Sequence, residues 1–309
     1  MFPPFTPLPD SADPEALTAH RATNDLRLLL QRHQHGRYDP TMSLTETDFW
    51  RAARTPDGPG TLHISLVNEA AATAFGPGAD WLLATVPWLI AETDVEPSIS
   101  SHHPAVAKAL HKHGVPRVSA SRLVLPELVF AILGQRVTGL EAMRQWSALC
   151  RHSSEAAPGP QSLLLPPNPI VLGNTPGWQY HRMGIERSRA DTIAAVCRRA
   201  VRVQEVAAMP LAEGYQRLMA FSGIGLWTAA TTMSSSMGDP DAVAVGDFHL
   251  KNIISYALAG EPRGTDERML ALLDPYAGHR GRIVEVLLRD GWSAPKYGPR
   301  QQIRSISTW

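Results

Sequence analysis

The chain has 309 residues, of which 44% are hydrophobic and 19% are charged, and its formal net charge is zero. This length is sufficient for two or three hydrophobic cores, and the composition is that of a soluble globular protein. The zero net charge argues against a large flat surface that follows phosphates, although it leaves room for a small basic groove. The two cysteines, Cys150 and Cys197, cannot build a four-thiolate zinc site or an iron–sulfur cluster. Their apolar surroundings predict buried free thiols.

Short segments with β-like patterns occupy the first part of the chain. The candidate strands are residues 25–30, 49–54 and 61–66. A Pro-Asp-Gly turn signal at residues 55–60 separates the second and third candidates, which predicts a hairpin. Residues 78–90 have the pattern of a helix that covers the sheet. We therefore expect an N-terminal α+β domain over residues 1–98.

Beyond residue 98 the patterns are helical. Residues 103–113 have helical periodicity, and residues 125–152 form one long helical region with Pro126 suited to its first turn. A proline-rich connection follows over residues 156–176. Further helices are expected at residues 187–203, 211–220, 226–237 and 281–289. The predicted fold class is α+β, in which the small antiparallel-sheet domain is followed by an all-α domain over residues 99–309.

No segment has the pattern of a membrane span or an export signal. The most apolar window, residues 79–91, is too short to cross a bilayer and contains Asp80 and Pro87. The first 18 residues are acidic and rich in proline, without a basic segment followed by an apolar run. We expect a cytoplasmic protein with no membrane partner.

The segment at residues 218–229, Leu-Met-Ala-Phe-Ser-Gly-Ile-Gly-Leu-Trp-Thr-Ala, joins two expected helices through a glycine turn. Gly223 and Gly225 permit positive φ angles and the close approach of another backbone. The amide groups that follow are free donors at a helix N-terminus, where they favour an anion such as a DNA phosphate. A plain helical hairpin with a glycine at the helix end is the alternative interpretation.

A second motif follows about twenty residues later, at residues 243–250, with the sequence Val-Ala-Val-Gly-Asp-Phe-His-Leu. Taken alone, Asp247 at a helix start is most often a cap. Together with the hairpin and with residues 131–138, Ala-Ile-Leu-Gly-Gln-Arg-Val-Thr, this motif resembles the helix-hairpin-helix, Gly/Pro-Asp superfamily of DNA glycosylases. The resemblance is to the bacterial 3-methyladenine DNA glycosylase II type, and its three ordered matches span about half the chain.

The resemblance implies a bilobal helical domain in which Asp247 faces the sugar of a nucleotide extruded from the duplex. Cleavage of an N-glycosidic bond builds positive charge on C1′, which a nearby carboxylate stabilises. Relatives that also cleave the strand have a lysine at the position of Trp227, where it forms a Schiff base. We therefore expect a monofunctional hydrolase, without lyase activity, that excises alkylated purines such as 3-methyladenine and 7-methylguanine from double-stranded DNA in base excision repair. It is expected to act as a monomer associated with the nucleoid.

The resemblance also implies contacts with the extruded base and with DNA. Arg136 stands where that branch has an apolar wedge, and Gln135 beside it is expected to probe the opposite strand. The remaining expected DNA-binding residues are Gly223, Gly225, Thr228 and Arg280. Trp227 is expected either to line the base pocket or to pack in the core. Further pocket candidates are Thr231 and His279, at positions where the branch has aromatic residues. Trp178 and Tyr180 are also candidates, although their segment could equally be a loop packed on the core.

In the family, carbonyl groups of the hairpin hold a monovalent cation, which implicates Met219, Phe221 and Ile224 here. No other cofactor is expected, and no iron–sulfur cluster. The departures from the family at His279 and Arg136 leave the preferred base open. Two alternatives to an alkylpurine glycosylase are therefore a glycosylase for deaminated or oxidised bases and a non-catalytic DNA-binding module that uses the hairpin alone.

Overall fold

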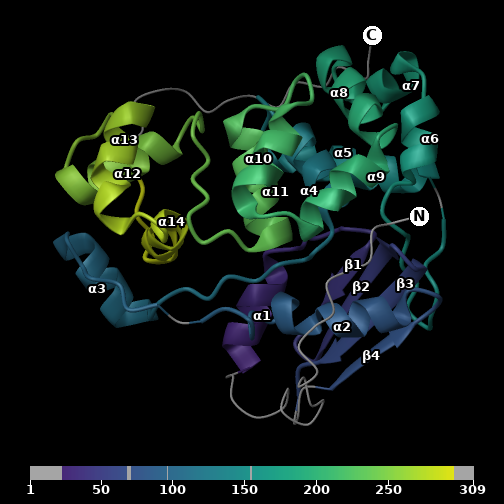
Figure 1. Ribbon diagram of the computed structural model, residues 1–309, viewed down its shortest axis with the longest axis horizontal. Coiled ribbons are helices and arrows are strands. Elements are labelled where there is room, and N and C mark those ends of the chain that lie inside the picture. The colour runs from purple at the N-terminus through teal and green to yellow at the C-terminus, as the bar shows by residue number, and fades with distance from the viewer. Residues whose placement is uncertain (1–22, 68–70, 96, 154, 296–309) are drawn as a thin grey trace.

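The structure, a computed structural model, describes residues 23–67, 71–95, 97–153 and 155–295 (Figure 1). Residues 1–18, in which no export signal is expected, lie outside these residues. No helix in the described ranges combines the length and the apolar character that crossing a lipid bilayer requires.

The first layer is an antiparallel sheet with the strand order β1-β2-β3-β4. Its strands are β1 (Met42–Leu44), β2 (Asp48–Thr55), β3 (Gly58–Ser65) and β4 (Ala72–Phe75). β2 and β3 form the predicted hairpin, whose register pairs Thr55 with Gly58 and Arg51 with Leu62. The Pro-Asp pair between the strands makes the turn that the sequence pattern indicated.

In Figure 1, α2 (Ala79–Leu89) lies across one face of the sheet, and α1 (Thr23–Gln31) stands beside the sheet. The helix expected at residues 78–90 is thereby confirmed as α2. The strand expected at residues 25–30 is wrong, because this segment is part of α1. Leu26, Leu29 and Leu30 are buried there, and their spacing places them on one side of a helix against the sheet.

The remainder of the described chain is helical. Its α-helices are α3 (Pro104–His113), α4 (Val124–Leu133), α5 (Gly139–Ser153), α6 (Pro169–Asn174), α7 (Gly177–Arg182), α8 (Arg187–Cys197), α9 (Ala200–Gln204), α10 (Leu211–Met219), α11 (Leu226–Met237), α12 (Leu250–Ala259), α13 (Asp266–Leu273) and α14 (Arg280–Arg289). Two short 3₁₀ helices, η2 (Glu205–Ala208) and η3 (Asp274–Tyr276), complete the set.

These helices surround two separate hydrophobic cores. The larger core takes its buried residues mainly from α4, α5, α8, α10 and α11. The smaller core joins α12, α13 and α14 to α3, which comes much earlier in the sequence. Figure 1 shows the two groups side by side. The α+β fold class with a bilobal helical part is therefore confirmed, and Cys150 and Cys197 are buried free thiols as expected.

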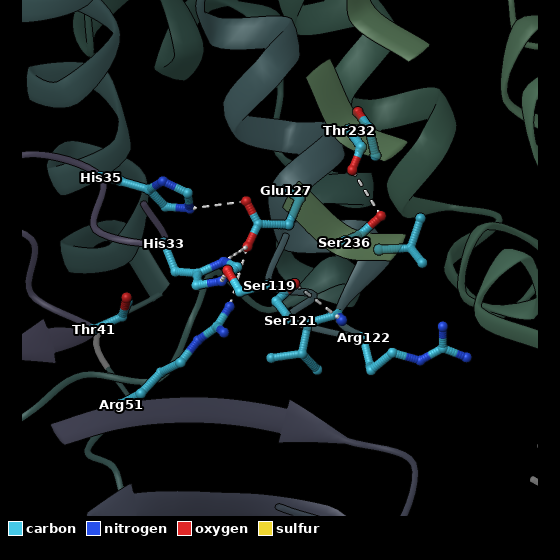
Figure 2. Close-up of polar contacts among 12 residues, drawn as sticks. His33, His35, Thr41, Arg51, Ser119, Ser121, Arg122, Glu127, Thr232 and Ser236 are labelled. Atoms are coloured by element: carbon cyan, nitrogen blue, oxygen red, sulfur yellow. Dashed lines mark hydrogen bonds and ion pairs between the residues drawn. The ribbon is translucent and has the colours of Figure 1, made fainter. Parts of the chain in front are cut away.

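A buried ionic cluster joins the sheet to the larger helical lobe (Figure 2). Glu127, in the first turn of α4, lies 3.1 Å from the guanidinium of Arg51 on β2. Its carboxylate oxygens also lie 3.8 Å from His33 and from His35, which follow α1. Burial alone would raise the pKa of Glu127, but these neighbours hold it at about 2. Burial lowers the pKa of His33 to about 4, so this histidine is neutral at pH 7.

The long helical region expected at residues 125–152 is two helices, α4 and α5, separated by a turn. Gly134 ends α4, and Arg136 takes a φ of +58°. The hydroxyl of Thr138 then accepts the backbone N–H of Glu141 at 3.3 Å, which satisfies a free donor at the start of α5. The break places the residue after Gln135 in a tight turn at the surface.

Candidate active site

Asp247 lies in the loop between α11 and α12, directly after Gly246, whose φ is +94°. Its Oδ1 accepts the backbone N–H groups of His249 and Leu250, both at 2.8 Å. Asp247 therefore satisfies free backbone donors at the start of α12, whose N-cap residue is His249. Its Oδ2 accepts no hydrogen bond from the described residues. The half-buried carboxylate is held in one orientation while one oxygen stays available to a ligand.

A second carboxylate, that of Asp266, restrains the peptide before Asp247. Asp266 is the first residue of α13, and its Oδ1 accepts the backbone N–H of Gly246 at 3.1 Å. Its Oδ2 lies 3.8 Å from the ammonium of Lys251 on α12. Asp266 thus connects the loop, α12 and α13. Sequence reasoning missed it, because no local motif marks a contact between residues this far apart in the chain.

Phe248, which follows Asp247 directly, was also missed. Its side chain is 76% exposed and meets the ring of His249 at a centroid distance of 4.9 Å. A large aromatic side chain left in water beside a carboxylate offers a face on which a base or sugar can stack. The signal that was available in the sequence is the aromatic residue immediately after the Gly-Asp pair.

In the hairpin between α10 and α11, only Gly223 uses the positive φ that the sequence permits at both glycines, because the φ of Gly225 is −97°. Gly223 takes a φ of +87°, and a Cβ there would collide with the hydroxyl of Thr192 on α8. Gly225 has no atom within 4 Å of its Cβ position. The backbone amides of Gly223, Gly225 and Trp227 donate to no other part of the described chain. The hairpin therefore presents free donors beside an open surface, which is the arrangement that binds an anion.

Gln135 connects the turn after α4 to this hairpin. Its Nε2 donates to the carbonyl of Gly223 at 2.9 Å and to the hydroxyl of Thr228 at 2.8 Å. The side chain of Thr228 is only 2% exposed. The Thr228 hydroxyl therefore faces Gln135 inside the protein, and a contact of this residue with DNA stays a prediction. Gln135 keeps only its carbonyl oxygen for any contact with a second strand.

Arg136, the expected wedge, is exposed at the surface. Its φ of +58° lies in the left-handed region, which costs an L-residue about 1–2 kcal/mol. Arg189 of α8 supports the turn, because its guanidinium donates to the carbonyl of Leu133 at 2.7 Å. An exposed side chain held in an unfavourable backbone conformation is typical of functional sites.

Trp227 and Thr231 lie on the side of α11 that faces the end of α4. Trp227 is half-buried, and its Cη2 would lie 3.1 Å from a Cβ at Gly134. Thr231 follows one turn later, where its hydroxyl donates to the carbonyl of Trp227 at 2.9 Å. Trp227 therefore packs against the Gly-Gln turn through a close approach that glycine permits.

His279 and Arg280 stand at the start of α14. The backbone N–H of His279 donates to the carbonyl of Tyr276 at 2.8 Å, and its Nδ1 is buried without a hydrogen-bond partner in the described chain. The guanidinium of Arg280 binds Asp241, with Nε 2.8 Å from Oδ1. Burial would raise the pKa of Asp241, but the hydrogen bonds from Arg280 outweigh it and lower that pKa. Arg280, an expected DNA contact, is thus paired within the protein.

Trp178 and Tyr180 do not join Asp247. Both belong to α7, which lies on the opposite side of the molecule from α12 (Figure 1). The hydroxyl of Tyr180 is buried and donates to the carbonyl of Leu172 at 2.8 Å. The ring of Trp178 is 59% exposed. Tyr180 is a core residue of the larger lobe, as the packed alternative expects, and a pocket role for Trp178 stays a prediction.

The backbone carbonyls expected to hold a monovalent cation lie at the hairpin. Those of Met219 and Ile224 accept no hydrogen bond within the described chain, and that of Phe221 accepts the N–H of Ile224 at 3.1 Å. Carbonyl oxygens with free lone pairs are suitable ligands for such a cation. The residues present therefore fit the group that the resemblance implies.

This chain is similar to known proteins in its structure and not in its sequence. No protein-family model matches the chain, and no curated protein matches its sequence. Solved structures do match. A 3-methyladenine DNA glycosylase from Archaeoglobus fulgidus superposes with a TM-score of 0.69 at 14% identity, over 85% of this chain and 93% of that chain.

Two further solved structures share the architecture. An 8-oxoguanine glycosylase/lyase from Clostridium acetobutylicum, in complex with double-stranded DNA, matches with a TM-score of 0.57 at 12% identity, over 81% of this chain and 98% of that chain. The Schizosaccharomyces pombe 3-methyladenine DNA glycosylase Mag1, bound to abasic DNA, matches with a TM-score of 0.50 at 16% identity, over 62% of this chain and 93% of that chain. The chain therefore has the fold of the helix-hairpin-helix DNA glycosylases.

Proposed function

We propose that this protein is a DNA glycosylase that hydrolyses the N-glycosidic bond of an extruded alkylated purine, with Asp247 as its catalytic carboxylate. The observation that carries the proposal is the geometry of Asp247, whose Oδ1 is fixed by two amides while Oδ2 has no partner in the described chain. The fold shared with solved DNA glycosylases supports it.

The chemistry requires one negative charge near C1′ of the sugar. As the bond to the base breaks, C1′ and the ring oxygen share a developing positive charge, which Asp247 stabilises and toward which it can orient a water molecule. A purine alkylated at N3 or N7 is already cationic, so it leaves without prior protonation. A single carboxylate therefore suffices for this substrate class.

DNA binding divides between the hairpin and the turn after α4. The free amides of Gly223, Gly225 and Trp227 receive a backbone phosphate. A monovalent cation at the carbonyls of the hairpin would add positive charge beside that phosphate. Extrusion of the base costs a few kcal/mol of stacking and pairing. Arg136, exposed on its turn, fills the gap in the duplex that the base leaves.

We propose that the enzyme does not cleave the strand, because position 227 holds a tryptophan. The nearest amine along the chain from Asp247 is that of Lys251, which lies 3.8 Å from Asp266. Incubation with a lesion duplex should leave abasic sites that break only after alkali. A covalent adduct trapped by borohydride reduction would overturn this part of the proposal.

The substrate is tested with a panel of duplexes that carry one lesion each. We expect release of 3-methyladenine and 7-methylguanine. A second candidate is a glycosylase for deaminated or oxidised bases, which the unpartnered Nδ1 of His279 and the likeness to an 8-oxoguanine glycosylase/lyase favour. Release of hypoxanthine, uracil or 8-oxoguanine in place of the alkylated bases would select it. If no base is released but binding depends on salt, the chain is a DNA-binding module.

A further inference from the structure

A loop after α1 carries an arginine and a tyrosine that no part of the proposed active site uses. Tyr38 is 77% exposed, although it is a large aromatic residue. The guanidinium carbon of Arg37 lies 5.6 Å from the centre of the Tyr38 ring, within the range of a cation–π contact. Arg37 forms no ion pair with any carboxylate of the described residues. Both side chains are therefore available to a ligand.

The loop beneath these two side chains is held firmly by Asp39, which is 6% exposed. Its Oδ2 accepts the backbone N–H of His35 at 2.8 Å. Its Oδ1 accepts the backbone N–H and the hydroxyl of Thr41, at 2.9 and 2.8 Å, and the indole N–H of Trp146 at 2.9 Å. A buried carboxylate with four donors fixes the loop from within.

The loop also packs directly on α5. Gly36 takes a φ of +99°, which favours glycine, and its Cβ position lies 2.8 Å from Cγ of Met143 on α5. The hydroxyl of Ser147 donates to the carbonyl of Tyr38 at 3.2 Å. The loop is therefore a rigid extension of the larger helical lobe, and its exposed arginine and tyrosine have a fixed position relative to α5.

α5 connects this loop to the Arg136 turn. The helix begins at Gly139, shortly after Arg136, and Leu140, Met143 and Arg144 are exposed along one side of it. With a rise of 1.5 Å per residue in the helix and at most 3.8 Å per residue before it, the Cα atoms of Arg136 and Met143 are less than about 20 Å apart. One turn of B-DNA is about 34 Å long.

We propose that Arg37 and Tyr38 form a second DNA contact, on the duplex beside the lesion, within one turn of the base pair that Arg136 enters. A guanidinium binds phosphate, and an aromatic face beside it packs on a sugar or a base. In a chain of zero net charge, an arginine without a carboxylate partner on a rigid loop is suited to a polyanion. This inference rests on the proposed function, because it assumes that DNA is the ligand.

The first test measures affinity for a lesion duplex at several salt concentrations, in the full chain carrying Asp247→Asn so that the DNA is not processed. Arg37→Ala should weaken binding and reduce the slope of log K against log salt by about one. Tyr38→Ala should weaken binding about tenfold with the slope unchanged. The matched control is Arg187→Ala with Trp178→Ala, an exposed arginine and an exposed aromatic on α8 and α7. This control should bind as its parent does.

The second test asks where the loop lies on the duplex. Because Cys150 and Cys197 are buried and are the only cysteines of the chain, Tyr38→Cys introduces its single accessible thiol. This thiol should form a disulfide with a thiol tethered to DNA within one turn of the lesion, and not with a tether two turns away.

The inference and the proposed function fail in different ways. If the otherwise unmodified chain excises a lesion while Arg37→Ala and Tyr38→Ala keep the parent's affinity and slope, the inference is overturned and the proposed function stands. If the chain binds no duplex of the panel, both are overturned.

Discussion

At the residue scale, the orientation of Asp247 depends on backbone donors and on a second carboxylate. Two amides of the α12 start fix its Oδ1, and Asp266 holds the amide of Gly246 before it. Gly246 has a positive φ, and nothing lies within 4 Å of its Cβ position. The residues before it, Val243 to Val245, pack on the smaller core. The position of the Asp247 carboxylate therefore depends on these hydrogen bonds together with the packing of the preceding loop.

Asp266→Ala should slow base release in a single turnover by about tenfold to a hundredfold, because the freed loop lets Asp247 drift from the sugar. Binding of the lesion duplex should stay the same. Asp266→Asn should keep part of the rate, since its amide oxygen still accepts the N–H of Gly246. Asp191→Ala, on the exposed side of α8, is the matched control. Equal rates for Asp266→Ala and the unmodified chain would remove Asp266 from the site.

Arg136 offers a separate test, because its side chain and its backbone conformation can be changed independently. Arg136→Ala and Arg136→Gly both remove the guanidinium, and both should lose most of the excision of a paired lesion. Only the glycine variant relieves the left-handed backbone, so it should be more stable than the alanine variant by about 1 kcal/mol in denaturant titrations. Full excision activity in both variants would exclude Arg136 as the wedge.

Local motifs in the sequence identified the residues whose roles depend on their immediate neighbours. Asp247 and the glycines of the hairpin belong to this class. The contacts of Gln135 with Gly223 and of Asp266 with Gly246 could not be predicted, because each joins segments that only the tertiary fold brings together. For Tyr180 the sequence left a pocket and a packed position open for the same reason, and the structure places its ring in the core.

At the element scale, the two glycines of the hairpin between α10 and α11 have different structural roles. Gly223 needs its positive φ and its lack of a side chain against Thr192. Gly225 has an ordinary φ of −97° and open space in front of it. Gly223→Ala should therefore lower the free energy of unfolding by more than about 1 kcal/mol. Gly225→Ala should leave stability unchanged and weaken DNA binding, because its new methyl group meets the approaching phosphate.

Thermal unfolding and a binding titration measure these two effects in the same pair of proteins. If Gly225→Ala binds duplex DNA with unchanged affinity, the hairpin does not receive the phosphate. If Gly223→Ala is fully stable, the packing of the hairpin on α8 is not required for folding.

The elements themselves were predictable where a pattern was long or was bounded by a clear turn. The hairpin of β2 and β3, α2 and α3 all belong to this class. The strand expected at residues 25–30 failed because a leucine-rich run of this length suits either structure, and burial decides between them. The break between α4 and α5 had a local signal in Thr-Gly-Leu-Glu at residues 138–141, a pattern typical of a helix start. The sequence carried no comparable local signal for the short edge strands β1 and β4.

At the scale of the whole molecule, the buried cluster around Glu127 ties the sheet to the larger helical lobe (Figure 2). The same cluster makes stability depend on pH. The unfolded chain binds a proton at His33 near pH 6.5, while the folded protein does so only near pH 4. Between these values the unfolded state holds more protons, so stability falls as the pH falls. Burial lowers the pKa of His35 as well, which acts in the same direction.

Glu127 continues this trend at lower pH. Its pKa is about 2 in the folded protein and about 4.5 when it is exposed. Its contribution to the free energy of unfolding is therefore fully present above pH 4.5 and is lost as the pH falls toward 2. From His33 alone, the free energy of unfolding should decrease by about 2 kcal/mol between pH 7 and pH 5. Urea titrations at the two pH values measure this difference.

His33→Gln removes the titrating group and should reduce that difference, whatever its effect on stability at pH 7. His111→Gln, exposed on α3, should keep the dependence of the unmodified chain. An unchanged pH dependence in His33→Gln would show that His33 does not contribute to the acid limit of the fold.

The central claim is that Asp247 stabilises the charge that develops on the sugar. Its most direct test is single-turnover release of 3-methyladenine from duplex DNA by the full chain and by Asp247→Asn, with the affinity of both for the same duplex measured alongside. Asparagine keeps the oxygen that accepts the two amides of α12 and removes only the negative charge. We expect the rate to fall at least about a hundredfold while affinity is retained. Release by Asp247→Asn at the rate of the unmodified chain would contradict the mechanism.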